Sequence, residues 1–179
     1  MKPSALALTL LCLVYVPTTR AAKSFTSASS LDMDCLDTTL GNWERTQAFS
    51  VSLWHKPASN SSGGLVCKQE GSGNFRGWAL RTRAGASSTQ YAAEVANTGS
   101  LTANVRTTSE FSSGTWRHIV VTYSGSGTAA GFHIYVGGSD QTLTTIDDTL
   151  GSNTILNSVP TQLGCRGGTS SPAFFVNGD

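Results

Sequence analysis

Three aspartates near the start of the chain are the side chains best suited to hold a metal ion. Asp32, Asp34 and Asp37 offer the hard carboxylate oxygens that Ca²⁺ prefers. Asp32 and Asp34 are two residues apart, so in a strand both point to the same side, where two carboxylates repel unless a cation lies between them. We therefore predict a weak calcium site at these three residues. Solvated acids that cap a strand explain the same pattern equally well.

The remaining acidic residues argue against glycoside hydrolysis, which needs two carboxylates flanking one scissile bond. Asp147 and Asp148 are adjacent, so in a strand their side chains point to opposite faces. The glutamates are isolated in the sequence: Glu44, Glu70, Glu94 and Glu110. We therefore expect no catalytic residue and no hydrolase activity.

Three histidines, His55, His118 and His133, fall in predicted strands and could converge on a metal ion across a sheet. Zinc sites more often use closely spaced ligands on loops. We therefore interpret these histidines as polar residues on the solvent side of a sheet.

Cysteine usage suggests one cross-link. Cys35, Cys67 and Cys165 follow the N-terminal leader, and an odd number in a secreted chain indicates one disulfide and one further thiol. We favour Cys67 with Cys165, because both lie in predicted strands and the long loop that they close would restrict the unfolded chain strongly. Three buried thiols are the alternative, since cysteine is often a small core residue.

The N-terminus predicts the compartment. Residues 5–16 form an apolar run that is too short to span a bilayer comfortably, Lys2 precedes it, and small residues lead up to Ala21. We predict a secretory signal peptide over 1–21 and hence a secreted, extracellular protein; a short membrane anchor is the alternative. Residues 22–30 are small and polar and are expected to be a flexible lead-in.

Charge and hydropathy exclude two classes of partner. Lys2 and Arg20 precede the predicted cleavage point, and without them the basic residues nearly balance the 11 acidic ones. The basic residues are also scattered, whereas nucleic-acid binding needs a basic face. Beyond the leader no segment is apolar enough to insert into a membrane.

The composition and patterning are typical of an all-β domain. Gly, Ser and Thr are abundant, charged residues make up only 13% of the chain, and long helical periodicity is absent. Short apolar or alternating segments between Gly/Ser-rich breaks predict closely spaced strands. These predicted strands are 49–57, 65–69, 77–83, 90–96, 101–108, 142–146 and 161–166.

A hairpin over 114–124 and 131–138 is the most distinctive pattern. The first strand is apolar nearly throughout its second half, as a central strand buried on both faces would be. Large aromatic residues at strand starts predict Trp54 and Trp116 as core or near-core anchors. The second strand alternates, with Phe132, Ile134 and Val136 on one face and His133 and Tyr135 on the other.

Together these segments resemble the laminin G-like jelly roll of the concanavalin A-like lectin/glucanase superfamily over residues 31–179. The hairpin resembles that group's pattern G-x-W-H-H-V-A-V-T-Y-D-G followed by L-Y-V-N-G. Residues 31–35 (LDMDC) resemble L-D-F-D-G, and residues 49–57 (FSVSLWHKP) resemble F-T-I-S-x-W-V-K-P. The order and spacing of the motifs follow one sandwich from end to end.

The resemblance implies a two-sheet antiparallel jelly-roll sandwich. In this group a closing strand with an I-D-E motif would come after Asp179, so we expect the last strand, and with it one acid of the calcium set, to be missing. The resemblance further implies a secreted, non-catalytic recognition module that binds carbohydrate or an extracellular protein through rim loops. Two alternatives stay open: a structural accessory domain of a larger secreted enzyme or adhesin, and a truncated glycoside hydrolase. Asn60 lies in an N-S-S sequon in a predicted surface loop and is a glycosylation site if the source is eukaryotic.

Overall fold

The computed structural model describes residues 24–25, 33–71, 75–98, 101–167 and 174–178. The predicted signal peptide (1–21), most of the predicted lead-in (22–30) and Asp32 lie outside these residues. Within the described ranges, no helix is both long enough and apolar enough to cross a membrane.

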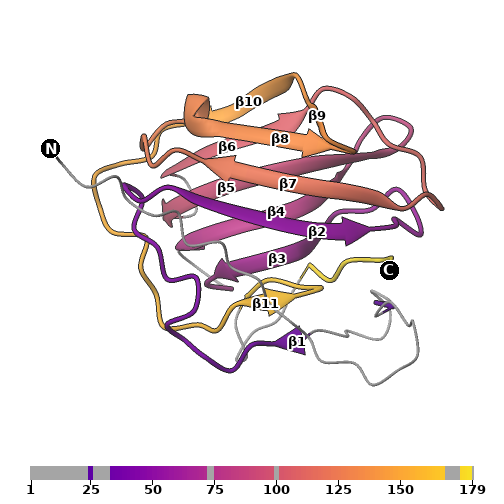
Figure 1. Cartoon of the computed structure of the whole chain (residues 1–179). Helices are drawn as coiled ribbons and strands as arrows, with labels where there is room; N and C mark the ends of the chain where they lie inside the picture. Colours follow the sequence, from indigo (N-terminus) through magenta and orange to yellow (C-terminus); the bar gives the residue numbers. More distant parts are fainter. Residues whose placement is uncertain (1–23, 26–32, 72–74, 99–100, 168–173, 179) are drawn as a thin grey trace, which may run out of the picture.

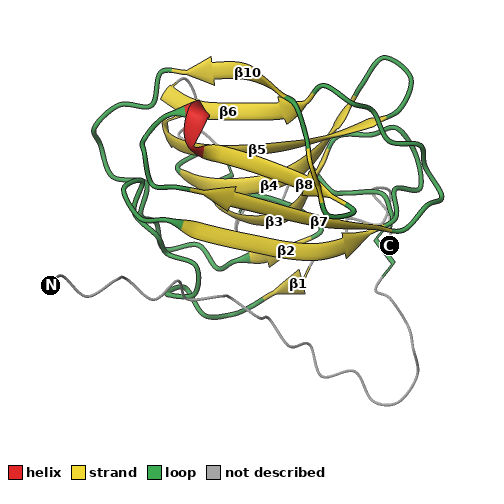
Figure 2. Cartoon of the chain, turned by 45° about the horizontal axis from the view of Figure 1, so that its top comes forward, coloured by secondary structure: helices red, strands yellow, loops and turns green. Residues whose placement is uncertain are grey.

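Two antiparallel β-sheets face each other (Figures 1 and 2). The larger sheet has seven strands, in spatial order β1 (Met33–Asp34), β11 (Gln162–Leu163), β3 (Gly63–Gln69), β4 (Gly77–Ala84), β5 (Thr89–Thr98), β6 (Leu101–Thr107) and β10 (Leu143–Asp148). The smaller sheet has four, in the order β2 (Phe49–His55), β7 (Arg117–Tyr123), β8 (Phe132–Val136) and β9 (Ser139–Asp140). A short 3₁₀ turn, η2 (Ala129–Gly131), precedes β8. The predicted all-β jelly-roll sandwich is confirmed.

The core lies between the sheets and follows from the period-2 alternation of the strands. Trp78 of β4 lies at its centre: it is 2% exposed, and its ring Nε1 donates to the carbonyl of Gly41 at 2.7 Å. The rings of Trp43 and Phe49 pack against it, with centroids 5.2 and 5.4 Å away. Further core side chains include Val51, Leu80, Tyr91, Val95, Val105, Ile119, Val121, Tyr123, Phe132 and Ile134.

Trp54 and Trp116 are not core residues, so that prediction is wrong. Trp54 is 64% exposed and Trp116 is 41% exposed. Along β2 the buried positions alternate with outward ones, and Trp54 takes an outward one, where its ring lies 5.2 Å from that of His118. The central strand β7 is likewise fully buried on one face only, because its alternate residues are only half-buried.

The predicted disulfide between Cys67 and Cys165 does not form. Cys67 is a free thiol, and its Sγ lies 3.7 Å from the carbonyl oxygen of Leu80. The residue opposite Cys67 on β11 is Gln162, so the strand register brings a different residue to the position that a disulfide partner needs. Burial raises the pKa of the Cys67 thiol to about 12. Cys67 and Cys165 are buried, whereas Cys35 is only half-buried, so the alternative of three buried thiols holds for two of them.

Candidate functional site

The outer face of the seven-stranded sheet carries a polar cluster that the strand register assembles. Residues directly opposite each other in an antiparallel ladder lie on the same face. Because Trp78, Leu80 and Tyr91 face the core, the alternate residues face outward. One outward row runs across five strands: Cys67, Ala79, Glu94, Asn104 and Asp147. The next row contains Arg81, Ala92 and Arg106.

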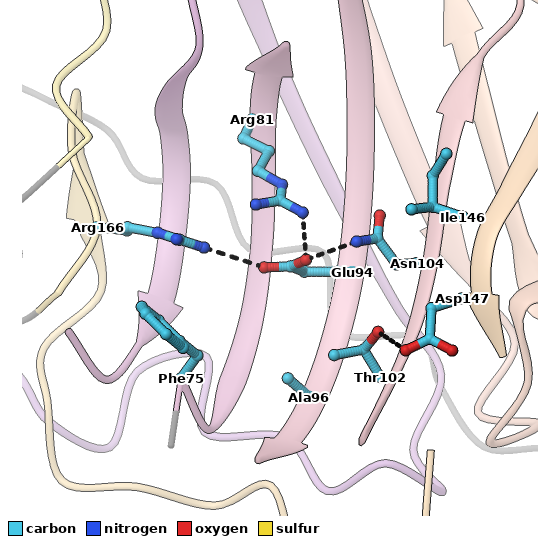
Figure 3. Close-up of a pocket in the computed structure, with 9 residues that line it drawn as sticks. All are labelled: Phe75, Arg81, Glu94, Ala96, Thr102, Asn104, Ile146, Asp147 and Arg166. Carbon is cyan, nitrogen blue, oxygen red and sulfur yellow. Dashed lines mark hydrogen bonds and ion pairs between the residues drawn. The ribbon is translucent and has the colours of Figure 1, made fainter. Parts of the chain in front are cut away.

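Glu94 lies at the centre of this cluster (Figure 3). Its Oε1 accepts hydrogen bonds from Gln69 Nε2 at 2.9 Å and from Arg166 Nη1 at 3.3 Å. Its Oε2 accepts from Arg81 Nη2 and from Asn104 Nδ2, the latter at 3.0 Å. A carboxylate offers about four lone-pair sites, so Glu94, which is 4% exposed, has all its acceptor sites occupied.

Arg166 reaches this cluster from the segment that follows β11. Its Cζ lies 4.6 Å from the ring centroid of Phe75 and 4.0 Å from that of Phe174. Both phenylalanines have positive φ, 50° and 54°, which side-chain-bearing residues rarely adopt and which often marks a functional site. The backbone of this segment packs closely on β3, because a Cβ at Gly64 would lie 2.5 Å from the carbonyl oxygen of Cys165.

Two adjoining hollows open on this face and share Arg81 and Arg166. The first, of about 280 Å³, is lined by Phe75, Arg81, Glu94, Ala96, Thr102, Asn104, Ile146, Asp147 and Arg166 (Figure 3). The second, of about 270 Å³, is lined by Ser62, Gly63, Gly64, Arg81, Thr82, Arg83, Arg166 and Phe174. The first hollow contains two carboxylates, whereas the described lining of the second contains three arginines and no acid. We call the surface formed by Arg81, Arg83, Arg106, Arg166 and Glu94 the arginine face.

Several polar atoms of the arginine face have unused hydrogen-bonding capacity. Among the described residues, the buried Nε atoms of Arg81, Arg106 and Arg166 and the Oδ1 atom of Asn104 have no hydrogen-bond partner. Burial lowers the pKa of Arg166; Glu94 opposes this shift, and Arg81 adds to it. Burial and the neighbouring Arg81 also lower the pKa of Arg83. The arginines therefore repel one another, and one carboxylate at their centre offsets only part of that repulsion.

The two predicted calcium ligands that the structure describes accept hydrogen bonds from neighbouring residues. Asp34 Oδ1 accepts from Gln162 Nε2 at 2.7 Å, and Asp37 Oδ1 accepts from the backbone N and Oγ1 of Thr39 at 2.8 and 2.7 Å. Asp32, which would complete the set, is outside the described residues. In the part of the chain that the structure describes, no three His, Cys, Asp or Glu side chains are grouped for a metal ion. The calcium site stays a prediction.

The histidines are separated, each with its own neighbour. His118 Nε2 lies 2.8 Å from Ser52 Oγ, and His133 Nδ1 lies 3.0 Å from Asp140 Oδ2, both on the smaller sheet. His55 is buried against Tyr91, so its interpretation as a solvent-facing residue is wrong. Asn60 is exposed in the loop after β2, as predicted for a sequon. Its side chain exchanges two 3.2 Å hydrogen bonds with the backbone of Gly85.

The sequence does not reveal the arginine face, because its members come from four separate segments: β4, β5, β6 and the segment after β11. The alternation of Arg81 and Arg83 with Leu80 and Thr82 was the one local signal, since it puts two cations on one face of a strand. Glu94 stands between alanines and gives no such signal.

The structure also places two acids in one hollow, Glu94 and Asp147, although they are far apart in the sequence. Glu94 and Asp147 lie in one row, two strand spacings or about 10 Å apart along the sheet. Glu94, however, has every acceptor site occupied, and Asp147 Oδ2 accepts from Thr102 Oγ1 at 2.9 Å and Thr149 Oγ1 at 3.0 Å. A general acid or base needs a free oxygen beside the substrate, and the Glu94 carboxylate offers none.

Comparison with known proteins supports the fold. Residues 33–176 match the profile of the Laminin_G_3 family, the concanavalin A-like lectin/glucanases superfamily. No curated protein matches the chain. A native heptameric SAP-like pentraxin from Limulus polyphemus is similar in structure, with 12% identity and a TM-score of 0.52. The similarity covers 74% of this chain and 60% of the pentraxin, so the chain spans less than two thirds of that protein.

The CBM40 of the Ruminococcus gnavus IT-sialidase is similar in two structures. Bound to α2,3 sialyllactose, it has 13% identity and a TM-score of 0.51, over 72% of this chain and 70% of that chain. Bound to α2,6 sialyllactose, it has 12% identity and a TM-score of 0.52, over 83% and 87%. At such identities the likeness shows a shared fold.

Proposed function

Because the chain belongs to the concanavalin A-like lectin/glucanases superfamily, we propose that it is a secreted, non-catalytic module that binds carbohydrate on the arginine face. The two adjoining hollows are the observation that carries this proposal. The binding surface is then the sheet itself, instead of the rim loops expected from the sequence.

The lining of the hollows suits a sugar. Sugar hydroxyl groups are recognised by hydrogen-bond donors and acceptors in fixed positions. The arginines supply donors, Asp147 supplies an acceptor, and Asn104 can supply either. Phe75 and Phe174 add aromatic surface at the edges, where the apolar face of a sugar ring can pack. Similar folds include a carbohydrate-binding module whose bound ligand is an oligosaccharide, which supports the same class of ligand here.

The absence of catalysis is part of the proposal. Glu94 is the acid at the centre of the face, and its two oxygens are held by four donors. It therefore acts as a structural anion that orients Arg81 and Arg166. In a truncated glycoside hydrolase this side chain would also have to act as a general acid, a general base or a nucleophile. Its four hydrogen bonds leave no oxygen free for such a role.

Secretion rests on the predicted signal peptide over 1–21. Protein recovered from the medium of expressing cells should begin at or near Ala22, as read by intact-mass measurement. Material that retains Met1 and stays with membranes would contradict this part of the proposal.

An extracellular protein ligand is the second candidate. The exposed Trp54, on β2 of the smaller sheet, and Trp116, just before β7, favour it, because exposed tryptophans are frequent in protein interfaces. A substitution of Trp54 should weaken binding of a protein ligand, whereas a substitution on the arginine face should weaken binding of a carbohydrate.

An array of oligosaccharides followed by calorimetry tests the carbohydrate proposal. Asn104→Leu, which keeps the side-chain size, should weaken binding of the best oligosaccharide by about tenfold, the effect of one or two lost hydrogen bonds. The matched control is Gln141→Leu, after β9, whose side chain bonds, among the described residues, only to the backbone of Ser139. Failure of the wild-type protein to bind any oligosaccharide, or equal binding by both variants, would refute the assignment.

A further inference from the structure

We infer that the second hollow of the arginine face binds the carboxylate of an acidic sugar, with a neutral sugar of the same oligosaccharide in the first hollow. This inference rests on the proposed carbohydrate-binding function and names its ligand class. It is argued from the charges, the hydrogen bonds and the burial of the residues around the two hollows.

The second hollow has the charge of an anion site. Arg81, Arg83 and Arg166 line it, and no carboxylate belongs to its described lining. The Ser62 hydroxyl is a further donor, and Gly63 and Gly64 also line the hollow, packed closely against the backbone of Val176 and Cys165. The side chain of Arg83 has no hydrogen bond or ion pair with any other described residue, so its guanidinium is available to a ligand.

Arg166 and Arg83 present donors that suit a planar carboxylate. Its Nη1 is held by Gln69 at 3.2 Å and by Glu94 at 3.3 Å, and two phenylalanine rings lie against its Cζ. The ring contacts and the bonds at Nη1 leave Nη2 without a partner among the described residues, whereas Nε is buried out of reach of a ligand. Nη2 can therefore donate one charge-assisted hydrogen bond to a carboxylate, and the planar fork that can pair with both carboxylate oxygens is the guanidinium of Arg83. Arg166 is 8% exposed, so its orientation is fixed before a ligand arrives.

The electrostatics of the face favour the same ligand charge. Burial lowers the pKa of Arg83 and of Arg166, and neighbouring arginines lower both pKa values further, while Glu94 opposes that effect at both residues. A bound anion would relieve the repulsion among the arginines, whereas a neutral sugar would leave it unchanged. Water is largely excluded from the buried guanidinium groups, which strengthens an added ion pair.

The first hollow is less positive than the second and therefore favours a neutral sugar. Asp147 and Glu94 line it, and a second carboxylate there would be repelled. Asp147 holds Thr102 and Thr149 through Oδ2, and its other oxygen makes no hydrogen bond with a described residue, so it can accept from a sugar hydroxyl. Arg81 and Arg166 are common to both hollows, so the two sugars would be neighbours in one chain.

Matched ligand pairs test the inference by calorimetry. Sialyllactose is compared with lactose, and a galacturonate disaccharide with its carboxyl-reduced form. The wild-type protein should bind the acidic member of at least one pair tenfold or more tightly than the neutral member, and the difference should shrink as salt is raised. A sulfated lactose is the third probe, because sulfate is an anion without the planar fork of a carboxylate.

Arg83→Gln is the test variant, since Arg83 lines only the second hollow and has no structural partner among the described residues. It should lose about tenfold in affinity for the acidic member and leave binding of the neutral member unchanged. Arg83→Lys keeps the charge without the fork and should recover part of the loss. Arg45→Gln, whose Nε donates to the Ser152 carbonyl away from this face, should match the wild type.

Each outcome separates the inference from the function on which it rests. Equal affinity for acidic and neutral members, or tighter binding of the sulfated lactose, overturns the carboxylate site while the carbohydrate-binding function stands. Binding to none of the probes or array sugars overturns both. An acid-specific affinity that Arg83→Gln leaves unchanged places the carboxylate elsewhere and refutes the assignment to the second hollow.

Discussion

Replacing Glu94 by Gln is expected to destabilise the protein strongly, although the two side chains have nearly the same size. The amide has one acceptor oxygen, so its NH₂ group faces two N–H donors that in the wild type donate to a carboxylate oxygen. At least two of the four hydrogen bonds are lost, because each carboxylate oxygen accepts one bond from a guanidinium and one from an amide. Hydrogen bonds to charged groups contribute about 1.5–3 kcal/mol each, and breaking a buried ion pair costs about 3–5 kcal/mol. We therefore expect a loss of about 3–5 kcal/mol.

Urea unfolding measures this loss as a shift of the midpoint by about 2 M, with the slope unchanged, for a slope of about 2 kcal/mol per M. The matched control is Glu70→Gln. Glu70 pairs with Arg76 at 2.7 Å, but the two side chains are 24% and 36% exposed, so that pair contributes only about 0–1 kcal/mol. If Glu94→Gln lies within 1 kcal/mol of Glu70→Gln (roughly the surface-pair range), the arginine face does not depend on a central carboxylate and the reasoning is refuted.

Further expectations concern the core, the backbone, pH and calcium. Trp78→Ala should cost about 3–5 kcal/mol in urea unfolding and Trp54→Ala less than about 1 kcal/mol; similar losses would contradict their burial. Gly64→Ala should lower the melting temperature and weaken acidic-sugar binding, because its Cβ would meet backbone at 2.5 Å; a silent substitution would show that the segment can move. Backbone N–H groups of the β4–β5 turn lower the pKa of Glu110 from 4.5, so its contribution is present at neutral pH and is lost as pH falls through the lowered value. Glu110→Gln should therefore lower the melting temperature at pH 7, with the difference closing in acid; a constant difference would exclude this linkage. Because the predicted calcium site is weak, calcium at millimolar concentration should raise the melting temperature of the wild type only slightly and that of Asp34→Asn not at all; equal shifts would place the ion elsewhere.

Local patterns were sufficient to predict the strands. Phe132, Ile134 and Val136 alternate with polar neighbours, and the structure buries these three and leaves the others at least partly exposed. The predicted bounds 77–83 and 90–96 differ from β4 and β5 by at most a few residues, because Gly- and Ser-rich breaks end the pairing locally. Features that depend only on neighbours along the chain, such as the positions and ends of strands, could therefore be predicted from the sequence.

Alternation alone did not reveal which side of a strand is buried. Trp54 was correctly placed opposite Phe49 and Val51 by the sequence, yet a large aromatic side chain suggested burial. Packing between the two sheets determines which face of each strand is buried, and it buries Trp78 in the core while Trp54 is exposed. The same applies to Cys67, whose neighbour across the ladder is Gln162, a pairing that only the register between distant strands determines.

The sequence by itself determined the fold class, the strands and the membership of the jelly-roll superfamily, because alternation, turn residues and motif order are properties of short segments. Only the tertiary structure decided that Glu94 gathers Arg81, Arg166 and Asn104, and that Asp147 shares a hollow with them. These residues come from β4, β5, β6, β10 and the segment after β11, and a shift of one residue in any strand register would turn its side chain to the opposite face. A polar face of this kind is therefore set by long-range pairing, which no local pattern encodes.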